Sequence, residues 1–339
     1  MHIPLTMVNP KSPNSAHAQQ FAPWLSALFG PNSAGPQGVA RRDPAASVSR
    51  DDVGCRPRFG GLGRTPGRPE RWSFCVTLTA AMRLDIHLQT HSETSVHGEH
   101  RYVGAPKSEI MLRCTQSLVT SINEASGDIL LRVFDDHSSP AAIAPLHRIL
   151  DGCRHPVEFV ALTDRGYNAS CVASFSRARD DARDLVYFVE DDYLHAPSAI
   201  PEMLEAHAFF KDKRGGAEVA LHPFDDPDNY LSPIYSRHDC RILYGPRRHW
   251  RTNTHTTNTC WVETATLRRN WELFDRLARY SSTPYGLEHH IFEESTINKI
   301  WREQVSLFTP LPSLALHLQY AAQQDPFLDW QRWWEAAAY

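Results

Sequence analysis

The sequence predicts an α/β fold in which a mostly parallel central sheet carries helices on both faces. Two observations support this: short apolar segments alternate with longer helical patterns, and each helical pattern separates two of the apolar segments. Because a helix that links two neighbouring strands returns the chain to the same edge, the strands should run parallel. The expected strands are 84–90, 129–134, 157–162 and 185–190. The expected helices between them are about 107–124, 140–150 and 168–182.

Residues 1–81 differ in composition from the rest of the chain. They hold 10 of the 24 prolines, 8 of the 17 glycines, and nine Arg or Lys against four Asp or Glu, whereas the remainder carries a net charge of −9. Such a segment cannot bury enough apolar area to offset its ordering entropy, so we expect it to be disordered. Met82 directly precedes the first expected strand. An alternative is therefore that the native chain starts at Met82 and that residues 1–81 are an over-extended translation start.

The elements that follow vary in how strongly the sequence marks them. Ser139 and Pro140 suit the N-cap and first position of the second helix. After residue 197 the order becomes mixed. Helices are expected near 197–211, 264–279, 288–303 and 326–336, and short strands near 217–221, 240–244, 260–263, 305–308 and 314–318.

Composition excludes several classes of protein. No stretch approaches 18 consecutive apolar residues, so a membrane span is not expected. Seven widely spaced cysteines without a C-x-x-C pair argue against a disulfide framework or thiolate zinc site and fit the cytoplasm. The arginines of the first segment are scattered and the rest is acidic, so no nucleic-acid partner is expected. The aromatic C-terminal helix, 326–339, either packs on the domain or makes peripheral membrane contact.

Acidic residues follow two of the expected strands. Strand 185–190 ends in Glu190, followed by Asp191 and Asp192, and strand 129–134 is followed by Asp135 and Asp136. Carboxyl ends of parallel strands meet at one edge, where acids can hold a divalent cation and a nucleotide. The alternatives are a solvated turn at 190–192, and a turn that Asp136 and Ser138 close while they cap the next helix.

A glycine precedes the third helix. Gly166, followed by Tyr167 and Asn168, suits a backbone that approaches a phosphate or ribose closely. The D-D-x-S sequence at 135–138, G-x-N at 166–168 and the acidic triplet together resemble the GT-A fold glycosyltransferases, family 2 above all, over about 82–320. That resemblance implies a nucleotide-binding half at about 82–195 and an acceptor half at about 196–325.

The resemblance also implies roles for individual residues. Glu190 and Asp192 stand at the family's D-x-D metal motif, with Glu in place of the usual first Asp, and the implied cofactor is Mn²⁺ or Mg²⁺. His317 stands about where a C-terminal histidine completes the metal shell, although a lone histidine in an apolar strand is also typical of a core. The implied donor-binding residues are Thr90, Asp135, Asp136, Gly166, Asn168 and Asp191.

A base for the reaction is implied at 292–301, which resembles the family's E-D motif. Glu294 stands at the position of the base, with Glu293 beside it and Glu288 as a rival, while a solvated helix face is the alternative. A carboxylate there would remove the acceptor hydroxyl proton. The polar segment 250–259 is too polar for a core strand, and either lines the acceptor pocket or forms an exposed loop.

These inferences predict a metal-dependent glycosyltransferase. It would move a sugar from a nucleoside diphosphate sugar to a glycan or other hydroxyl acceptor, with inversion, in surface polysaccharide or glycoconjugate synthesis. One alternative is a nucleotidyltransferase, although the polar segment 90–94 lacks the glycine-rich, basic loop expected of one. The other is a non-catalytic nucleotide-sugar or carbohydrate-binding module, suggested by glutamate in place of aspartate at 190 and 294.

Overall fold

Four parallel strands form the first half of the sheet, as predicted. The computed structural model describes residues 82–93, 103–231, 239–256, 258–280, 292–293, 295–319, 325 and 328–339, which belong to one compact unit. The parallel strands lie in the order β3 (Val157–Ala161), β2 (Asp128–Asp135), β1 (Arg83–Thr90) and β4 (Leu185–Glu190). The predictions for segment 1–81, Glu288 and Glu294 concern residues outside these ranges.

The sheet continues through five further strands to a total of nine. Beyond β4 come β9 (Cys260–Glu263), β6 (Val219–Leu221), β10 (Ser306–Leu311), β8 (His249–Asn253) and β7 (Ile242–Tyr244). Among the strands that the structure describes in this sheet, only β9 and β8 run against the others. A separate antiparallel pair joins β5 (Tyr193–His195) to β11 (Ala315–His317). The predicted mostly parallel sheet is confirmed.

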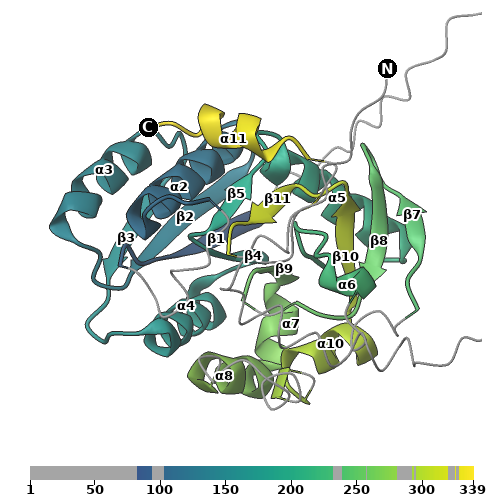
Figure 1. The fold of residues 1–339 in the computed structure, drawn as a ribbon. Coiled ribbons are helices and arrows are strands. Elements are labelled where there is room, and N and C mark those ends of the chain that lie inside the picture. The colour runs from purple at the N-terminus through teal and green to yellow at the C-terminus, as the bar shows by residue number, and fades with distance from the viewer. Residues whose placement is uncertain are drawn as a thin grey trace, which may run out of the picture. The chain divides into compact units, whose positions relative to one another are not determined.

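Helices cover both faces of the parallel half (Figure 1). On one side lie α2 (Lys107–Asn123) and α3 (Pro140–Asp151), and on the other lies α4 (Tyr167–Asp181). The remaining helices are α5 (Ala199–Lys213), α6 (Asp228–Leu231), α7 (Thr264–Arg269), α8 (Trp271–Tyr280), α10 (Ile297–Glu303) and α11 (Trp330–Ala336). Pro140 opens α3 as predicted, and Ser139 is its N-cap, although its side chain makes no capping hydrogen bond.

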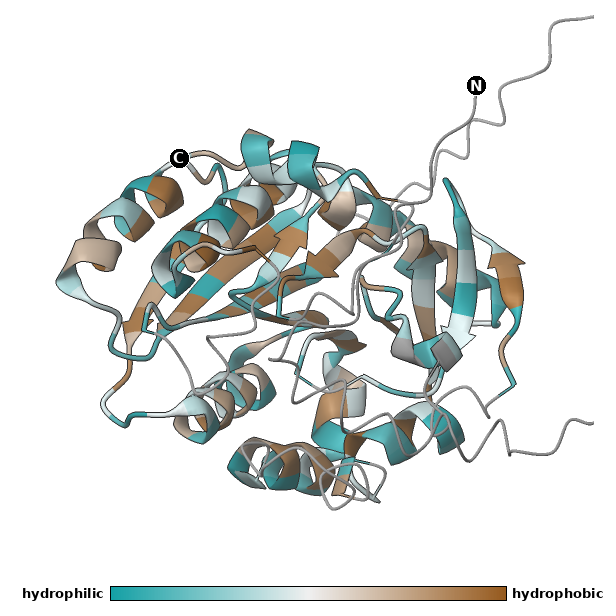
Figure 2. Ribbon diagram, viewed as in Figure 1, coloured by the Kyte–Doolittle hydropathy of each residue, from teal (hydrophilic) through white to brown (hydrophobic). Residues whose placement is uncertain are grey.

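Strand β1 is buried on both faces but has two different surfaces. Leu84, Ile86 and Leu88 belong to the larger hydrophobic core, to which α2 and α3 contribute. The alternate residues Asp85 and His87 are equally buried, and the His87 Nδ1 donates to a carbonyl of α4. Figure 2 accordingly shows hydrophobic strands interrupted by hydrophilic positions. The face beneath α4 is therefore held partly by polar contacts.

The aromatic helix α11 packs back on the domain. Trp330, Trp333 and Trp334 lie partly buried against the larger core. The Arg113 guanidinium of α2 lies 4.7 Å from the ring centre of Trp334 and donates to its backbone carbonyl at 2.7 Å. These contacts support the packing interpretation. Within the ranges that the structure describes, no helix is long and apolar enough to cross a membrane.

Candidate functional site

The predicted acids meet at the carboxyl edge of β1, β2 and β4. In the parallel register Thr90 of β1 lies opposite Asp135 of β2, and Gln89 of β1 lies opposite Glu190 of β4. Asp191 and Asp192 follow immediately and are both buried. The sequence prediction that two acidic strand ends share one edge therefore agrees with the strand register.

Asp192 faces His317, so the structure brings two of the predicted metal ligands together. The His317 Nε2 lies 3.4 Å from a carboxylate oxygen of Asp192. Strand pairing creates this proximity, because β11 runs antiparallel to β5 with His317 opposite Tyr193, and the Leu318 backbone N–H donates to the Asp192 carbonyl at 2.8 Å. The Tyr193 ring stacks on the imidazole, with centres 4.6 Å apart.

Burial and nearby charge shift the pKa values of His317 and Glu190, which both lie near Asp192. Burial lowers the pKa of His317, but the Asp192 carboxylate and then Glu190 oppose it, so the net shift is upward. Burial, and then the negative charge of Asp192, raise the pKa of Glu190. Carboxylates packed this closely favour a compensating positive charge, which the imidazolium or a metal ion can provide.

Glu190 makes its own contacts away from His317. Its Oε1 accepts a hydrogen bond of 2.8 Å from the Tyr167 hydroxyl at the start of α4, and its Oε2 accepts one of 3.2 Å from the Thr259 hydroxyl. The Asn258 side-chain amide donates to the same Tyr167 oxygen. Sequence reasoning did not predict these contacts, although Tyr167 lies inside the G-x-N motif and Asn258 and Thr259 end the polar segment 250–259.

Asp191 has a buried cationic partner that sequence reasoning also missed. Its carboxylate contacts the Lys107 ammonium and accepts a 2.7 Å hydrogen bond from the His91 backbone N–H. Lys107 opens α2, where the helix dipole disfavours a cation, so the Asp191 carboxylate must offset both that effect and the burial of the ammonium. A lysine at the first position of a predicted helix was the available signal.

Asp135 and Asp136 organise the turn that follows β2. Asp135 accepts from the Thr90 hydroxyl and from the Ser138 backbone N–H, both at 3.0 Å. Asp136 accepts from the Gly166 backbone N–H at 2.9 Å and from the His137 Nδ1 at 3.0 Å. The turn therefore forms, but Asp135 and not the predicted Asp136 contacts Ser138 in it, whereas Asp136 links the end of β2 to the start of α4.

The start of α4 requires glycine. Gly166 has φ of +102°, a backbone conformation that residues with a Cβ rarely adopt. The conformation leaves its N–H directed at Asp136. Two residues on, the Asn168 side-chain amide donates to the Arg279 carbonyl of α8 at 2.6 Å. Asn168 thus contacts a neighbouring helix as well as occupying its predicted place in the motif.

The polar segment 250–259 is neither wholly a loop nor exposed. His249–Asn253 is strand β8, contrary to the prediction that segment 250–259 is too polar for a core strand, because β10 pairs with it and buried Arg251 pairs with Asp225 at 3.1 Å. Thr256, which follows, is also buried, and its carbonyl accepts a 3.0 Å hydrogen bond from Trp301 of α10. These polar residues serve internal hydrogen bonds.

One of the three candidate bases can be described. Glu293 is buried and interacts electrostatically with His255, whose pKa burial lowers to about 3 while Glu293 opposes the shift. Its backbone carbonyl accepts a 3.2 Å hydrogen bond from the Thr296 backbone N–H, shortly before α10 begins. Phe292 and Glu293 are helical, within the helix expected near 288–303, and α10 begins at Ile297.

The described residues offer a divalent cation two side chains. No group of three or more His, Cys, Asp or Glu suited to a metal occurs in the part of the chain that the structure describes. Asp192 and His317 nevertheless supply a carboxylate oxygen and an imidazole nitrogen, which Mn²⁺ accepts, and Mg²⁺ is commonly held by one or two carboxylates plus substrate phosphates. The donor set fits a cation whose remaining positions are filled by a diphosphate and water.

Comparisons with known proteins give matches in structure alone. No model of a known protein family matches the chain, and no curated protein matches it in sequence. The chain is similar in structure to TarS 1–349 from S. aureus, at 13% identity and a TM-score of 0.40, with 68% of this chain and 60% of that one covered. For the same protein in complex with UDP, the identity is 12% and the TM-score 0.41, with 67% of this chain and 60% of that one covered.

A mannosyltransferase is also similar in structure. The mannosyltransferase PcManGT from Pyrobaculum calidifontis, in complex with GDP-Man and Mn²⁺, matches at 13% identity and a TM-score of 0.36, over 56% of this chain and 47% of that chain. The chain thus spans less than two thirds of the length of each of these structures.

Proposed function

We propose that this chain is a metal-dependent glycosyltransferase, which transfers a sugar from a nucleoside diphosphate sugar to a hydroxyl acceptor. The observation that carries the proposal is the Asp192–His317 pair, 3.4 Å apart at the carboxyl edge of the parallel strands, with side chains that are 11% and 14% exposed. Ligands of α/β proteins bind at such edges. The β5–β11 pairing brings a carboxylate and an imidazole together at this edge, where the two groups can bind a cation. A solvated surface turn would not need such a pair.

The proposed cofactor is Mn²⁺ or Mg²⁺, held by Asp192 and His317. When bound, the cation supplies Lewis-acid neutralisation of charge on the leaving diphosphate. The Asp192 carboxylate lies at this place, and the Tyr193 ring and the β5–β11 pairing hold the imidazole beside it. The neighbouring Asp191 is already neutralised by Lys107, so it does not compete for the cation.

The nucleotide would lie over the ends of β1 and β2. The proposed donor-binding residues are Thr90, Asp135, Asp136, Gly166, Asn168 and Asp191. The internal hydrogen bonds of Asp135 and Asp136 suggest that their main contribution is to fix the turn at 135–139 and the start of α4. The donor then meets a surface that is already ordered, which lowers the entropy cost of binding.

Transfer with inversion is the proposed chemistry. It requires a carboxylate that accepts the proton of the attacking hydroxyl, and Glu294 is the proposed base, with Glu293 and Glu288 as alternatives. We place the reaction in surface polysaccharide or glycoconjugate synthesis, in the cytoplasm or at the inner face of the membrane. These finer assignments depend on the resemblance of the sequence motifs.

Asp192→Asn and His317→Gln test the proposal, with Asp212→Asn as a matched control because the Asp212 side chain is 73% exposed. Mn²⁺ binding is measured by electron paramagnetic resonance, and release of UDP or GDP is measured with a panel of nucleotide sugars. The two site variants should raise the Mn²⁺ Kd about 10-fold to 100-fold, as expected for loss of a metal contact, and abolish nucleotide release.

Other outcomes would contradict the proposal. Unchanged Mn²⁺ affinity in both site variants would remove the metal site. Pyrophosphate release from a nucleoside triphosphate and a sugar phosphate would instead indicate a nucleotidyltransferase. Donor binding by the wild-type chain, with no transfer to any acceptor and no hydrolysis, would indicate a binding module.

A further inference from the structure

Glu190 accepts hydrogen bonds from two segments that lie far apart in the sequence. The Tyr167 hydroxyl of α4 donates to its Oε1 at 2.8 Å, and the Thr259 hydroxyl, just before β9, donates to its Oε2 at 3.2 Å. Each carboxylate oxygen of Glu190 thus has a partner from a different element. The contacts join the start of α4 to the segment that leads into β9.

The partners of Glu190 are themselves held in place. The Asn258 amide donates to the Tyr167 oxygen, so the phenol is fixed from both the β4 side and the β9 side. The Thr259 carbonyl accepts hydrogen bonds from the His222 Nδ1 at 2.8 Å and from the Thr256 hydroxyl at 2.7 Å. A pre-ordered set of donors around a carboxylate is typical of a site whose geometry matters.

The length of the side chain explains why glutamate occupies this position. An aspartate would end one methylene earlier, about 1.5 Å nearer the backbone. From there a carboxylate could not keep both the Tyr167 and the Thr259 hydrogen bonds without movement of the backbone. Glutamate at the first position of the acidic motif therefore has a structural reason, which the sequence alone did not reveal.

We infer that Glu190 is a positioning residue, which clamps the start of α4 to the Asn258–Thr259 segment and leaves the cation to Asp192 and His317. The inference rests on the proposed metal-dependent function. Asp136 already holds Gly166 from the end of β2, so the clamp would fix the following residue, Tyr167, from the end of β4. The start of α4 is then held across two strand ends, beside the proposed nucleotide.

Glu190→Asp separates positioning from metal binding, because it keeps the charge and removes the reach. We expect its Kd for Mn²⁺ alone to stay within about threefold of wild type, while Asp192→Asn raises it at least 10-fold. The Kd for UDP or GDP in the presence of Mn²⁺, whichever nucleotide the wild type binds, should rise about 10-fold. Tyr167→Phe should give the same split.

The two halves of the clamp should be coupled. The double variant Glu190→Asp with Tyr167→Phe should lose no more nucleotide affinity than the worse single variant, because both remove one interaction. Glu335→Asp and Tyr244→Phe, at exposed positions, are the matched controls and should leave both affinities unchanged. If the losses of nucleotide affinity in the two single variants multiply in the double variant, the two residues act independently and the inference is overturned.

Two further results would also overturn it. If Glu190→Asp weakens Mn²⁺ binding as much as Asp192→Asn does, Glu190 is a metal ligand. If neither Mn²⁺ nor nucleotide affinity changes, the clamp positions nothing. Should the wild type bind neither ligand, the proposed function fails, and thermal unfolding of the same variants still tests the clamp. Coupled losses of a few degrees in Tm would support it, and independent losses would refute it.

Discussion

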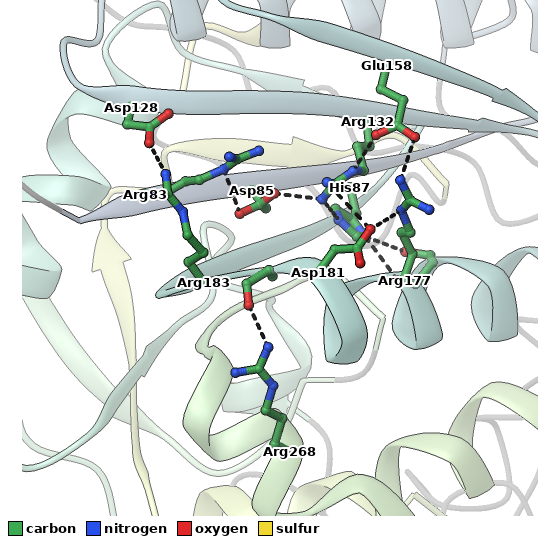
Figure 3. A network of polar contacts seen from close by, with 12 residues as sticks. Arg83, Asp85, His87, Asp128, Arg132, Glu158, Arg177, Asp181, Arg183 and Arg268 are labelled. Carbon is green, nitrogen blue, oxygen red and sulfur yellow. Dashed lines mark hydrogen bonds and ion pairs between the residues drawn. The ribbon is translucent and has the colours of Figure 1, made fainter.

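Replacement of Arg132 by methionine should be among the most destabilising single changes in the sheet. Arg132 is 5% exposed, and its guanidinium lies between β1, β2 and β3. It donates to Asp85 at 2.6 Å, to Glu158 at 2.7 Å and to the His87 ring at 3.3 Å (Figure 3). Methionine fills a similar volume but leaves the Asp85 carboxylate in the sheet with one remaining cation, Arg83, at 3.3 Å.

The expected magnitude follows from the burial of Asp85, which is fully inaccessible. Removing one partner of a buried ion pair costs about 3–5 kcal/mol. Because Arg83 still offsets part of the charge, we expect the lower end, about 3 kcal/mol, out of a total stability of about 5–15 kcal/mol. For a domain of this size that corresponds to a fall in Tm of roughly 6–12 °C.

Urea unfolding at pH 7 measures the effect. Arg177→Met is the matched control, because its side chain is 46% exposed and its pairs with Glu158 and Asp181 should contribute less than about 1 kcal/mol. The double variant Asp85→Leu with Arg132→Met should recover most of the loss, since it leaves no buried charge. Equal losses for Arg132→Met and Arg177→Met would refute the reasoning.

Three other predictions concern stability. Burial lowers the pKa of His87 to about 3 and of His195 to about 4, so the unfolded chain binds more protons than the folded chain below pH 6.5. Each histidine should therefore lower the free energy of unfolding by about 2 kcal/mol at pH 5 relative to pH 8. A urea midpoint that does not change with pH would contradict this. Gly166→Ala should cost about 1–2 kcal/mol because φ is +102°, whereas Gly104→Ala, which has open space around its Cβ, should cost less than 0.5 kcal/mol; equal midpoints in urea would rule out the strain. Lys107→Met removes the cation that pairs with the buried Asp191 carboxylate, and should lower the free energy of unfolding by about 3 kcal/mol. The Tm should recover when Asp191 is also replaced by asparagine.

The parallel half of the fold was predictable because three of its four strands, β1, β2 and β4, are buried on both faces. A strand buried in this way often reads as a continuous apolar run, as β4 does, and the prediction for 185–190 matches β4 at both ends. The same rule failed for β8, whose polar residues are satisfied by β10 and by Asp225. The expected helix at 264–279 is divided at Asn270 into α7 and α8.

The location of the site was predictable, but the division of roles among its acids was not. Acids at strand ends of a parallel sheet must share an edge, so the sequence predicts their meeting. What each acid does depends on partners distant in the chain: Lys107 is 84 residues from Asp191, and Thr259 is 69 residues from Glu190. No local pattern encodes such contacts.

The pairing of β5 with β11 determines when the proposed metal site can form. Asp192 precedes β5, whereas His317 ends β11, so the two ligands are synthesised far apart in time. The first four strands can pair while the later ones are still being made, because chains fold progressively during synthesis. If Asp192 and His317 hold a cation as proposed, affinity for it should arise only once β11 has docked, so cation binding would mark completed folding.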